Sequence, residues 1–195
     1  MWHVIGLGNP DKEYEGTRHN VGREVVAHLA KKLNLVFKEE KNARAHIASG
    51  TIGGKSIILI LPDVQMNKAG KTAKAFIRNK NEAKNLLVVR DDIDMGLGSM
   101  KLTFKRGSGG HRGTESILEQ IKTKEFYQLK LGILPLSPSG RPKKPKGEKK
   151  VVSFILSEFK PAEQKIMQTE IKRAGEAIES FLKEGFSKSA SNFNT

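Results

Sequence analysis

The stretch WHVIGLGNPDKEYEGTRHNVGREVVAHLAKKL, residues 2–33, predicts a strand, a loop and a helix in that order. Residues 2–8 are an apolar run of strand length, and residues 20–33 carry apolar side chains at helical spacing. The loop between them, residues 8–18, is rich in polar side chains. A strand, a polar loop and a helix in succession indicate an α/β fold, in which ligands bind beyond the carboxyl ends of the strands.

The alternation of strands and helices continues along the rest of the chain. Further strands are expected at 45–62 (two strands around the Gly53-Gly54 turn), 85–94, 99–105 and 126–134, and helices at 68–79, 113–122 and 162–184. Two helices are expected to close the chain, the last beginning beside Pro161 and ending at Gly185. We therefore predict one three-layer α/β domain over residues 1–195. Its mixed, mostly parallel sheet is flanked by helices and includes an antiparallel pair near 44–61.

Composition limits the cellular setting and the chemistry. The 195 residues, 37% of them hydrophobic, suffice for one well-buried core, and the longest apolar runs are far too short to span a membrane. No export signal is visible, and the absence of cysteine excludes disulfides, thiolate zinc sites and a cysteine nucleophile. We expect a cytoplasmic protein that does not bind membranes.

The charge balance points to an anionic partner. The chain has 35 Lys and Arg against 21 Asp and Glu, a formal net charge of +14. A positive potential of this size attracts polyanions over long range, so nucleic acid is the leading candidate partner. A basic protein can also owe its charge to solubility alone, and this alternative stays open until a site is found.

Polar side chains cluster where the predicted strands end or the next helices begin. These residues are Asn9, His19, Asn67, Asp91, His111 and Arg112. Because the carboxyl ends of parallel strands share one edge of a sheet, the loops that carry them are expected to meet at one crevice. No histidine pair has HExxH or i,i+4 spacing, so we expect neither a metal nor a cofactor.

His19 is the first candidate for chemistry. It lies between Arg18 and Asn20 where the first loop meets the first helix. A partly buried imidazole with an acidic neighbour can act as a general base near neutral pH. Taken alone, the same residues could equally be a polar cluster that caps the helix.

Five blocks of sequence together resemble bacterial peptidyl-tRNA hydrolases. They are GLGNPDKEYEGTRHNVG (6–22), PDVQMNKAG (62–70), RDDIDMGLGSMKL (90–102), GSGGHRGTESI (107–117) and GFSKSASNFN (185–194). The blocks stand in the family's order and at family-like separations over nearly the whole chain. Five ordered blocks are far more specific than any single motif.

The resemblance implies that the protein hydrolyses the ester between a peptide and the terminal ribose of tRNA. It implies that His19 is the general base that activates water and that Asp91 orients this base and polarises it. Asn9 and Asn67 match the family's site amides, and Tyr14 and Met66 match positions that line the pocket. The resemblance also suggests a monomer.

The resemblance implies contacts with the RNA backbone as well. Lys101, Lys105 and Lys130 are candidate phosphate contacts, and the basic loop near 135–150 resembles the family's mobile lid. Arg112 stands where the family usually has an asparagine that contacts substrate, so it is included in the binding set. Two further departures are Arg90, usually histidine, and Thr103, usually basic; Lys101 or Lys105 could supply the contact that Thr103 lacks.

Two other functions remain as hypotheses. The first is an RNA-binding adaptor with the same fold and no catalysis, which the surplus charge and Arg112 would suit. The retained set of Asn9, His19, Asn67 and Asp91 argues against it. The second treats DDID at 91–94 as a magnesium site of a phosphodiesterase, which a chelator would inactivate.

Overall fold

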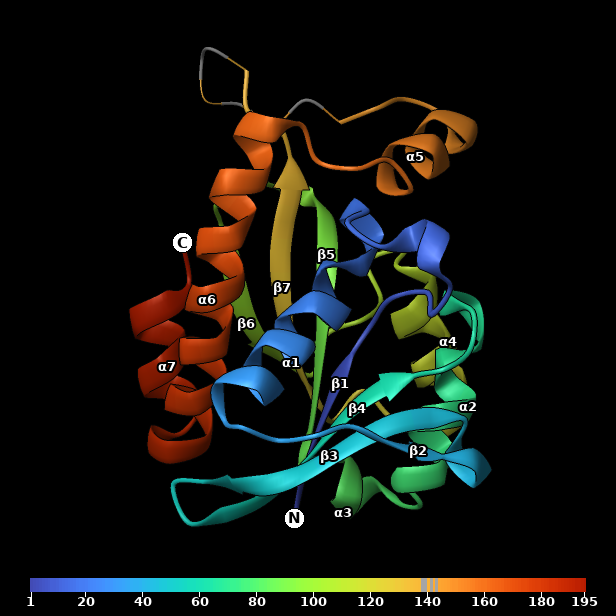
Figure 1. Ribbon diagram of the computed structural model, residues 1–195, viewed down its shortest axis with the longest axis vertical. Coiled ribbons are helices and arrows are strands. Elements are labelled where there is room, and N and C mark those ends of the chain that lie inside the picture. The colour runs from blue at the N-terminus through green and yellow to red at the C-terminus, as the bar shows by residue number, and fades with distance from the viewer. Residues whose placement is uncertain (138–139, 141, 143) are drawn as a thin grey trace.

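The computed structural model describes residues 1–137, 140, 142 and 144–195, and within them one mixed sheet crosses the molecule (Figure 1). Its strands are β1 (Trp2–Gly6), β2 (Lys38–Glu40), β3 (Ala45–Ile52), β4 (Lys55–Pro62), β5 (Leu86–Gly96), β6 (Met100–Phe104) and β7 (Tyr127–Leu134). The helices are α1 (Val21–Lys32), α2 (Ala69–Phe76), α3 (Lys80–Ala83), α4 (Arg112–Ile121), α5 (Glu148–Ile155), α6 (Pro161–Glu184) and α7 (Phe186–Phe193). Short 3-10 turns include η2 (Arg18–Asn20) and η4 (Met66–Lys68).

The sheet is parallel at its centre and antiparallel at both edges. The strand order is β2-β3-β4-β1-β5-β7-β6, with β4, β1, β5 and β7 parallel. Strands β2 and β3 extend one edge in antiparallel pairing, and β6 pairs antiparallel with β7 at the other. The predicted fold class is therefore confirmed. The expected hairpin turns at Gly53 and Gly54, whose φ angles of 55° and 77° favour glycine.

Helices cover both faces of the sheet, so the apolar side chains are buried in two clusters. One cluster lies beneath α1 and α6, and the other lies beneath α2 and α4 (Figure 1). Adjacent residues of β1 serve opposite faces: Val4 packs into the first cluster and Ile5 into the second, both fully buried. Because side chains on both faces of β1 are buried, the sequence of the strand is apolar at successive positions and not only at alternate ones.

Helix α1 lies very close to the sheet at Gly22. A Cβ at Gly22 would be 2.2 Å from the carbonyl oxygen of Val89 in β5 and 2.9 Å from that of Leu7. Only glycine permits this approach of backbone to backbone. The close contact holds the start of α1, and the η2 turn that precedes it, over the carboxyl half of β5.

The structure corrects several expected boundaries. Strand β5 runs to Gly96, two residues beyond the expected end at 94, so Asp91 lies within the strand and not in a loop that follows Arg90. The basic segment 141–150 is not all loop, because α5 starts at Glu148; its residues 141 and 143, like 138 and 139 of the expected lid, lie outside the described residues. Strand β2 and helix α7 were not predicted.

Among the described residues, no helix combines the length and the apolar character that crossing a membrane requires.

Candidate active site

Three buried side chains from three elements meet at the carboxyl half of β5. Nδ1 of His19, on η2, lies 2.9 Å from Oδ1 of Asp91, on β5. Nε2 of His111, the residue before α4, lies 2.9 Å from the same oxygen. The two imidazole rings are 4.9 Å apart between centroids. Each side chain is less than a tenth exposed, so the carboxylate is screened from bulk water.

His111 is held as the neutral tautomer with its proton on Nε2. Its Nδ1 accepts the backbone N–H of Thr114 at 3.2 Å and so caps α4, which requires an unprotonated Nδ1. Burial lowers the pKa of His111, although the neighbouring Asp91 carboxylate opposes this shift. The Nε2–H therefore donates to Asp91.

Asp91 stays ionised within this pocket. Burial alone would raise the pKa of Asp91, but the electrostatic attraction and the hydrogen bonds of the His19 and His111 rings outweigh it and hold the pKa well below its usual range. An ionised Asp91 accepts the Nδ1–H of His19. The other ring nitrogen, Nε2, then keeps its lone pair, as a general base requires.

Asn9 is oriented by a closed set of hydrogen bonds. Its Oδ1 accepts the backbone N–H of Met66 at 2.8 Å, and its own backbone N–H donates to Oδ1 of Asn20 at 2.8 Å. Nδ2 of Asn20 returns a bond to the Asn9 carbonyl at 3.0 Å. Because the Asn9 side-chain oxygen is occupied, its amide N–H groups are the ones that face a ligand.

Two cavities lie on either side of His19. The first cavity, about 200 Å³, is lined by residues that include Arg90, Asp91, Asp92, Gly109, Gly110 and His111. The second cavity, about 360 Å³, is lined by residues that include Asn9, Tyr14, Met66, Asn67 and Lys68. His19, Arg112, Val152 and Ile155 border both cavities. A substrate with its reacting group beside His19 would thus have room in both cavities.

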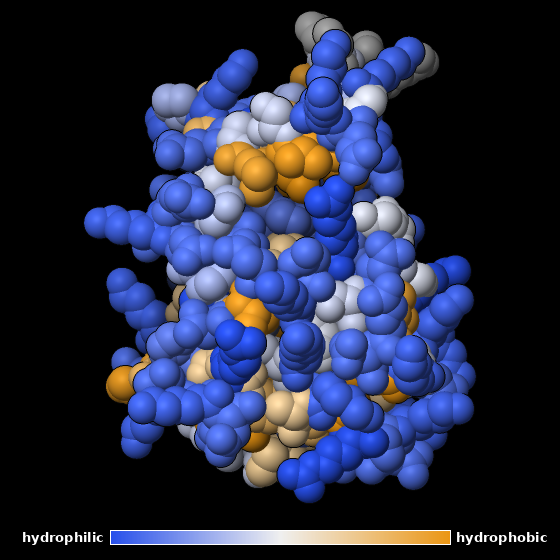
Figure 2. All heavy atoms as spheres, turned by 90° about the vertical axis from the view of Figure 1, so that its right-hand side faces the viewer, coloured by the Kyte–Doolittle hydropathy of each residue, from blue (hydrophilic) through white to orange (hydrophobic). Residues whose placement is uncertain are grey.

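Helix α5 covers both cavities with its apolar side. No residue of α5, all of which the structure describes, is fully buried. Figure 2 shows hydrophobic side chains gathered near the top of the face that carries α2 and α4, at the height of α5 in Figure 1. One end of α5 is held by an ion pair of 2.8 Å between Arg112 and Glu148, both exposed.

Arg18, next to His19, holds the other end of α5. Its guanidinium lies over the rings of Phe154 and Phe159, 4.5 Å and 4.6 Å from their centroids. It also donates to Glu163 at 2.6 Å and to the Ile133 carbonyl at 3.2 Å. The turn that carries His19 and the segment that joins α5 to α6 are therefore fastened by one buried side chain.

Arg90, where the resemblance expects histidine, is buried beneath the loop that leads into α4. Its Nε donates to Gln128, and its Nη1 donates to the Asp91 carbonyl at 2.7 Å. Gln128 in turn donates to the carbonyls of Arg106 and Gly107. Arg90 Nη2 has no hydrogen-bond partner in the described part of the chain, and Asp92 Oδ2 is 3.5 Å from it.

The structure divides the predicted site residues into two groups. His19, Asp91, Asn9, Tyr14, Met66, Asn67 and Arg112 all line the cavities. The three predicted lysines lie apart from them: Lys101 faces Lys130 across the β6–β7 pair, and Lys105 pairs with Glu125 at 2.6 Å. Lys130 is 3.5 Å from Asp92, and its pKa is lowered by burial and by the charge of Arg90.

His111 was expected at the crevice, but no chemical role was predicted for it from the sequence. The signal was present, because a histidine directly before a helical pattern, within GSGGHRG, occupies a capping position. That its other nitrogen reaches Asp91 depends on the tertiary structure. His19, Asp91 and His111 also form the one group in the described residues that could hold a metal ion, with ligand atoms within 4.8 Å of one another. The two hydrogen bonds that His19 and His111 donate to Asp91 also explain why these ligand atoms lie so close together.

A buried histidine and carboxylate that open onto two cavities in a three-layer α/β fold form an arrangement that is chemically suited to hydrolysis. A family model described as Peptidyl-tRNA hydrolase matches residues 3–195, so the chain belongs to the peptidyl-tRNA hydrolase family.

Curated relatives and solved structures agree with this assignment. A peptidyl-tRNA hydrolase of Aquifex aeolicus is 44% identical over 172 residues, 88% of this chain and 84% of that protein. One of Dehalococcoides mccartyi is 37% identical over 192 residues, 98% of each chain. The crystal structure of peptidyl-tRNA hydrolase from Acinetobacter baumannii has a TM-score of 0.88 and 28% identity, covering 100% of this chain and 95% of that one.

Proposed function

We propose that this protein hydrolyses the ester bond of peptidyl-tRNA and returns the tRNA for reuse, with His19 as the general base. The observation that carries the proposal is the His19–Asp91 pair, 2.9 Å long, between two cavities. Family membership and the names of the relatives support the same substrate class.

In the proposed mechanism, Nε2 of His19 takes a proton from water as the water attacks the ester carbonyl. Asp91 holds Nδ1–H and stabilises the imidazolium that forms. The free amide N–H groups of Asn9, and Asn67 beside it in the second cavity, are the donors for the developing oxyanion. As the bond between the carbonyl carbon and the ribose oxygen breaks, the imidazolium protonates that oxygen, which leaves as the free hydroxyl, and His19 is neutral again.

The linings of the two cavities suggest which arm of the substrate each receives. The second cavity combines Met66 and Leu156 with amide side chains, which suits a peptide of variable sequence. The first cavity is lined by the buried cation Arg90 and by Asp92, which lies 3.5 Å from the half-buried Lys130; these cations suit the RNA arm.

The test is release of free tRNA from an N-blocked aminoacyl-tRNA by purified protein in EDTA. Wild type, His19→Ala and His28→Ala are compared, since His28 lies on α1 outside both cavities. We expect rapid release that persists in EDTA, falls roughly 10²- to 10⁴-fold in His19→Ala and is retained in His28→Ala. Binding of tRNA without cleavage would reject the proposal in favour of an RNA-binding adaptor, and loss in EDTA would indicate a metal-dependent reaction.

A further inference from the structure

A row of cations follows α2 and α3 away from the active site. We call it the basic stripe; its members are Lys68, Lys71, Lys74, Arg78, Lys80 and Lys84, all exposed. The segment 64–85 that contains it has one acidic residue, Glu82. On α2 the lysines recur every three residues, a spacing of about 4.5 Å along the helix axis.

The cations of the basic stripe have no acidic partners. Within the described residues, no carboxylate oxygen lies within 4.0 Å of the charged side-chain nitrogens of these residues, whereas ion pairs of this length occur elsewhere in the molecule. Glu82 accepts the backbone N–H of Arg78 at 2.6 Å. On the neighbouring α4, Glu115 and Glu119 are exposed and form no ion pair with the stripe.

The face formed by α1, α6 and α7 is organised differently. Its ion pairs are Lys32–Glu179, Lys183–Glu179, Arg173–Glu170 and Lys188–Glu184. Cations and carboxylates are therefore interspersed there, whereas along α2 and α3 they are segregated. A surface selected only for solubility mixes both signs, so the segregation calls for an anionic ligand.

The positive charge of the stripe contributes to the lowered pKa of a nearby carboxylate. Glu125, which follows α4, has a lowered pKa, first because of its hydrogen bond and ion pair with Lys105 and further because of Lys84 and Lys80. Two stripe lysines thus act on a carboxylate that is already paired with another cation.

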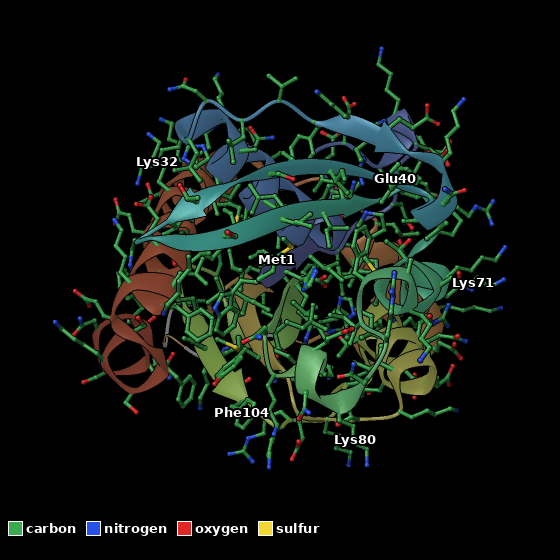
Figure 3. The ribbon with its side chains drawn as sticks, turned by 90° about the horizontal axis from the view of Figure 1, so that it is seen from below. Met1, Lys32, Glu40, Lys71, Lys80 and Phe104 are labelled. Atoms are coloured by element: carbon green, nitrogen blue, oxygen red, sulfur yellow. The ribbon has the colours of Figure 1, made fainter. Side chains whose placement is uncertain are left out.

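The position of the stripe relates it to the active site. Lys68 lines the second cavity together with Asn9 and Asn67, whereas the other members of the stripe follow α2 and α3 outside both cavities. The stripe is thus available to the body of the RNA while the second cavity holds the peptide. Figure 3 shows Lys71 and Lys80 pointing outward from this side of the molecule. Lys101 on the edge strand β6 and its neighbour Lys130 on β7 are not members of the stripe.

We propose that the basic stripe is a second contact surface for the phosphate backbone of the RNA substrate. The choice of RNA rests on the proposed function. Lysine is a point charge on a flexible stem, so the stripe would bind phosphates without reading sequence, as an enzyme acting on many tRNAs requires. It would add affinity for the body of the RNA and not for its terminal nucleotide.

The experiment compares two quadruple variants that remove the same charge. The stripe variant carries Lys71→Gln, Lys74→Gln, Lys80→Gln and Lys84→Gln; the control carries Lys165→Gln, Lys172→Gln, Lys183→Gln and Lys188→Gln, all exposed on α6 and α7. Lys68 is left intact because it lines the cavity. The dissociation constant of each protein for deacylated, full-length tRNA is measured at several salt concentrations. Thermal melting of each variant checks that it folds.

We expect the stripe variant to bind tRNA at least tenfold more weakly near 0.1 M salt, with a smaller salt dependence. Each lost phosphate contact lowers the slope of log K against log salt by roughly 0.7 to 0.9. The control should change the dissociation constant less than about threefold, since at that salt distant charges are screened. Equal weakening in both variants, or none in either, would overturn the proposal.

The binding assay needs no hydrolysis, so the two proposals fail separately. A wild-type protein that does not cleave the ester, but whose tRNA binding depends on the stripe, would refute the catalytic proposal alone. A wild-type protein that cleaves the ester, but whose tRNA binding is unchanged in the stripe variant, would refute the stripe alone.

Discussion

Nε2 of His111 lies 2.9 Å from Oδ1 of Asp91, the same oxygen that accepts the proton of His19. One carboxylate oxygen therefore receives two imidazole N–H groups in a buried site. Hydrogen bonds to a charged group contribute about 1.5–3 kcal/mol each, and they keep the carboxylate ionised. In the proposed mechanism, His111 therefore helps to position His19 through Asp91 and does not contact the substrate through Nε2.

Replacing His111 should separate its two roles. His111→Asn keeps an acceptor that can cap α4 but loses the bond to Asp91, whereas His111→Ala loses both. We expect the free energy of unfolding to fall by about 1–3 kcal/mol in His111→Asn and by about a further 1 kcal/mol in His111→Ala. Urea denaturation at neutral pH measures both, and equal stability of Asn variant and wild type would show that the Asp91 bond contributes nothing.

The lowered pKa of His111 predicts a loss of stability on mild acidification. Below its ordinary pKa of 6.5 the unfolded chain binds a proton at this histidine, while the folded chain resists it. Stability should thus decrease as the pH falls from 7 to 5. The decrease should be smaller in His111→Asn. Other groups that titrate in this range contribute equally to both proteins, so their contributions cancel in the comparison; one of them is His3, whose pKa is also lowered by burial. Parallel curves for the two proteins would contradict the assignment.

Asp91→Asn should damage catalysis more than binding. An amide in this position can no longer hold His19 in the tautomer that leaves Nε2 free, so kcat should fall roughly 10²- to 10⁴-fold with KM changed less than about threefold. Asp94→Asn is the matched control, because Asp94 lies on the same strand but outside both cavities. Steady-state release of tRNA distinguishes them, and a similar kcat for both variants would remove Asp91 from the mechanism.

Two glycines on helices should respond oppositely to alanine. A Cβ at Gly22 would lie 2.2 Å from the Val89 carbonyl oxygen, so Gly22→Ala should destabilise the fold by about 1–3 kcal/mol. At Gly175 in α6 the nearest atom, Cδ2 of His28, is 3.8 Å away, an ordinary contact. Gly175→Ala should be neutral or stabilise by up to about 1 kcal/mol. Thermal or urea unfolding compares them, and tolerance of alanine at Gly22 would show that α1 can shift.

Glu148→Gln tests the ion pair that holds α5. The pair with Arg112 is exposed, so its contribution to folding should be below about 1 kcal/mol. Because the substitution frees Arg112 at the border of both cavities, KM should fall roughly two- to fivefold while stability hardly changes. Glu176→Gln, on α6 and far from α5 in sequence, serves as the control. A raised KM in Glu148→Gln would mean that the ion pair helps to form the binding site.

Much of the fold could be predicted because burial leaves a periodic pattern. The central strands read as continuous apolar runs, since both faces of the sheet are covered by helices. Strand β2 was missed because its three residues, Lys38–Glu40, are charged and pair only at the sheet edge. Helix α7 was missed because the residues between its two phenylalanines, Phe186 and Phe193, are small or polar and show no apolar repeat at helical spacing; both phenylalanines pack against the core.

For the site, the chemical groups could be predicted from the sequence alone: the imidazole of His19, the carboxylate of Asp91 and the amide of Asn9, each in a recognisable block. Residue identity and local spacing suffice for that, because they are encoded within a few positions. Two features became known only from the folded chain: His111, 92 positions after His19, donates to the same oxygen of Asp91, and α5 covers both cavities. Such contacts depend on how helices pack across the sheet, and packing is set by the shape of the whole core.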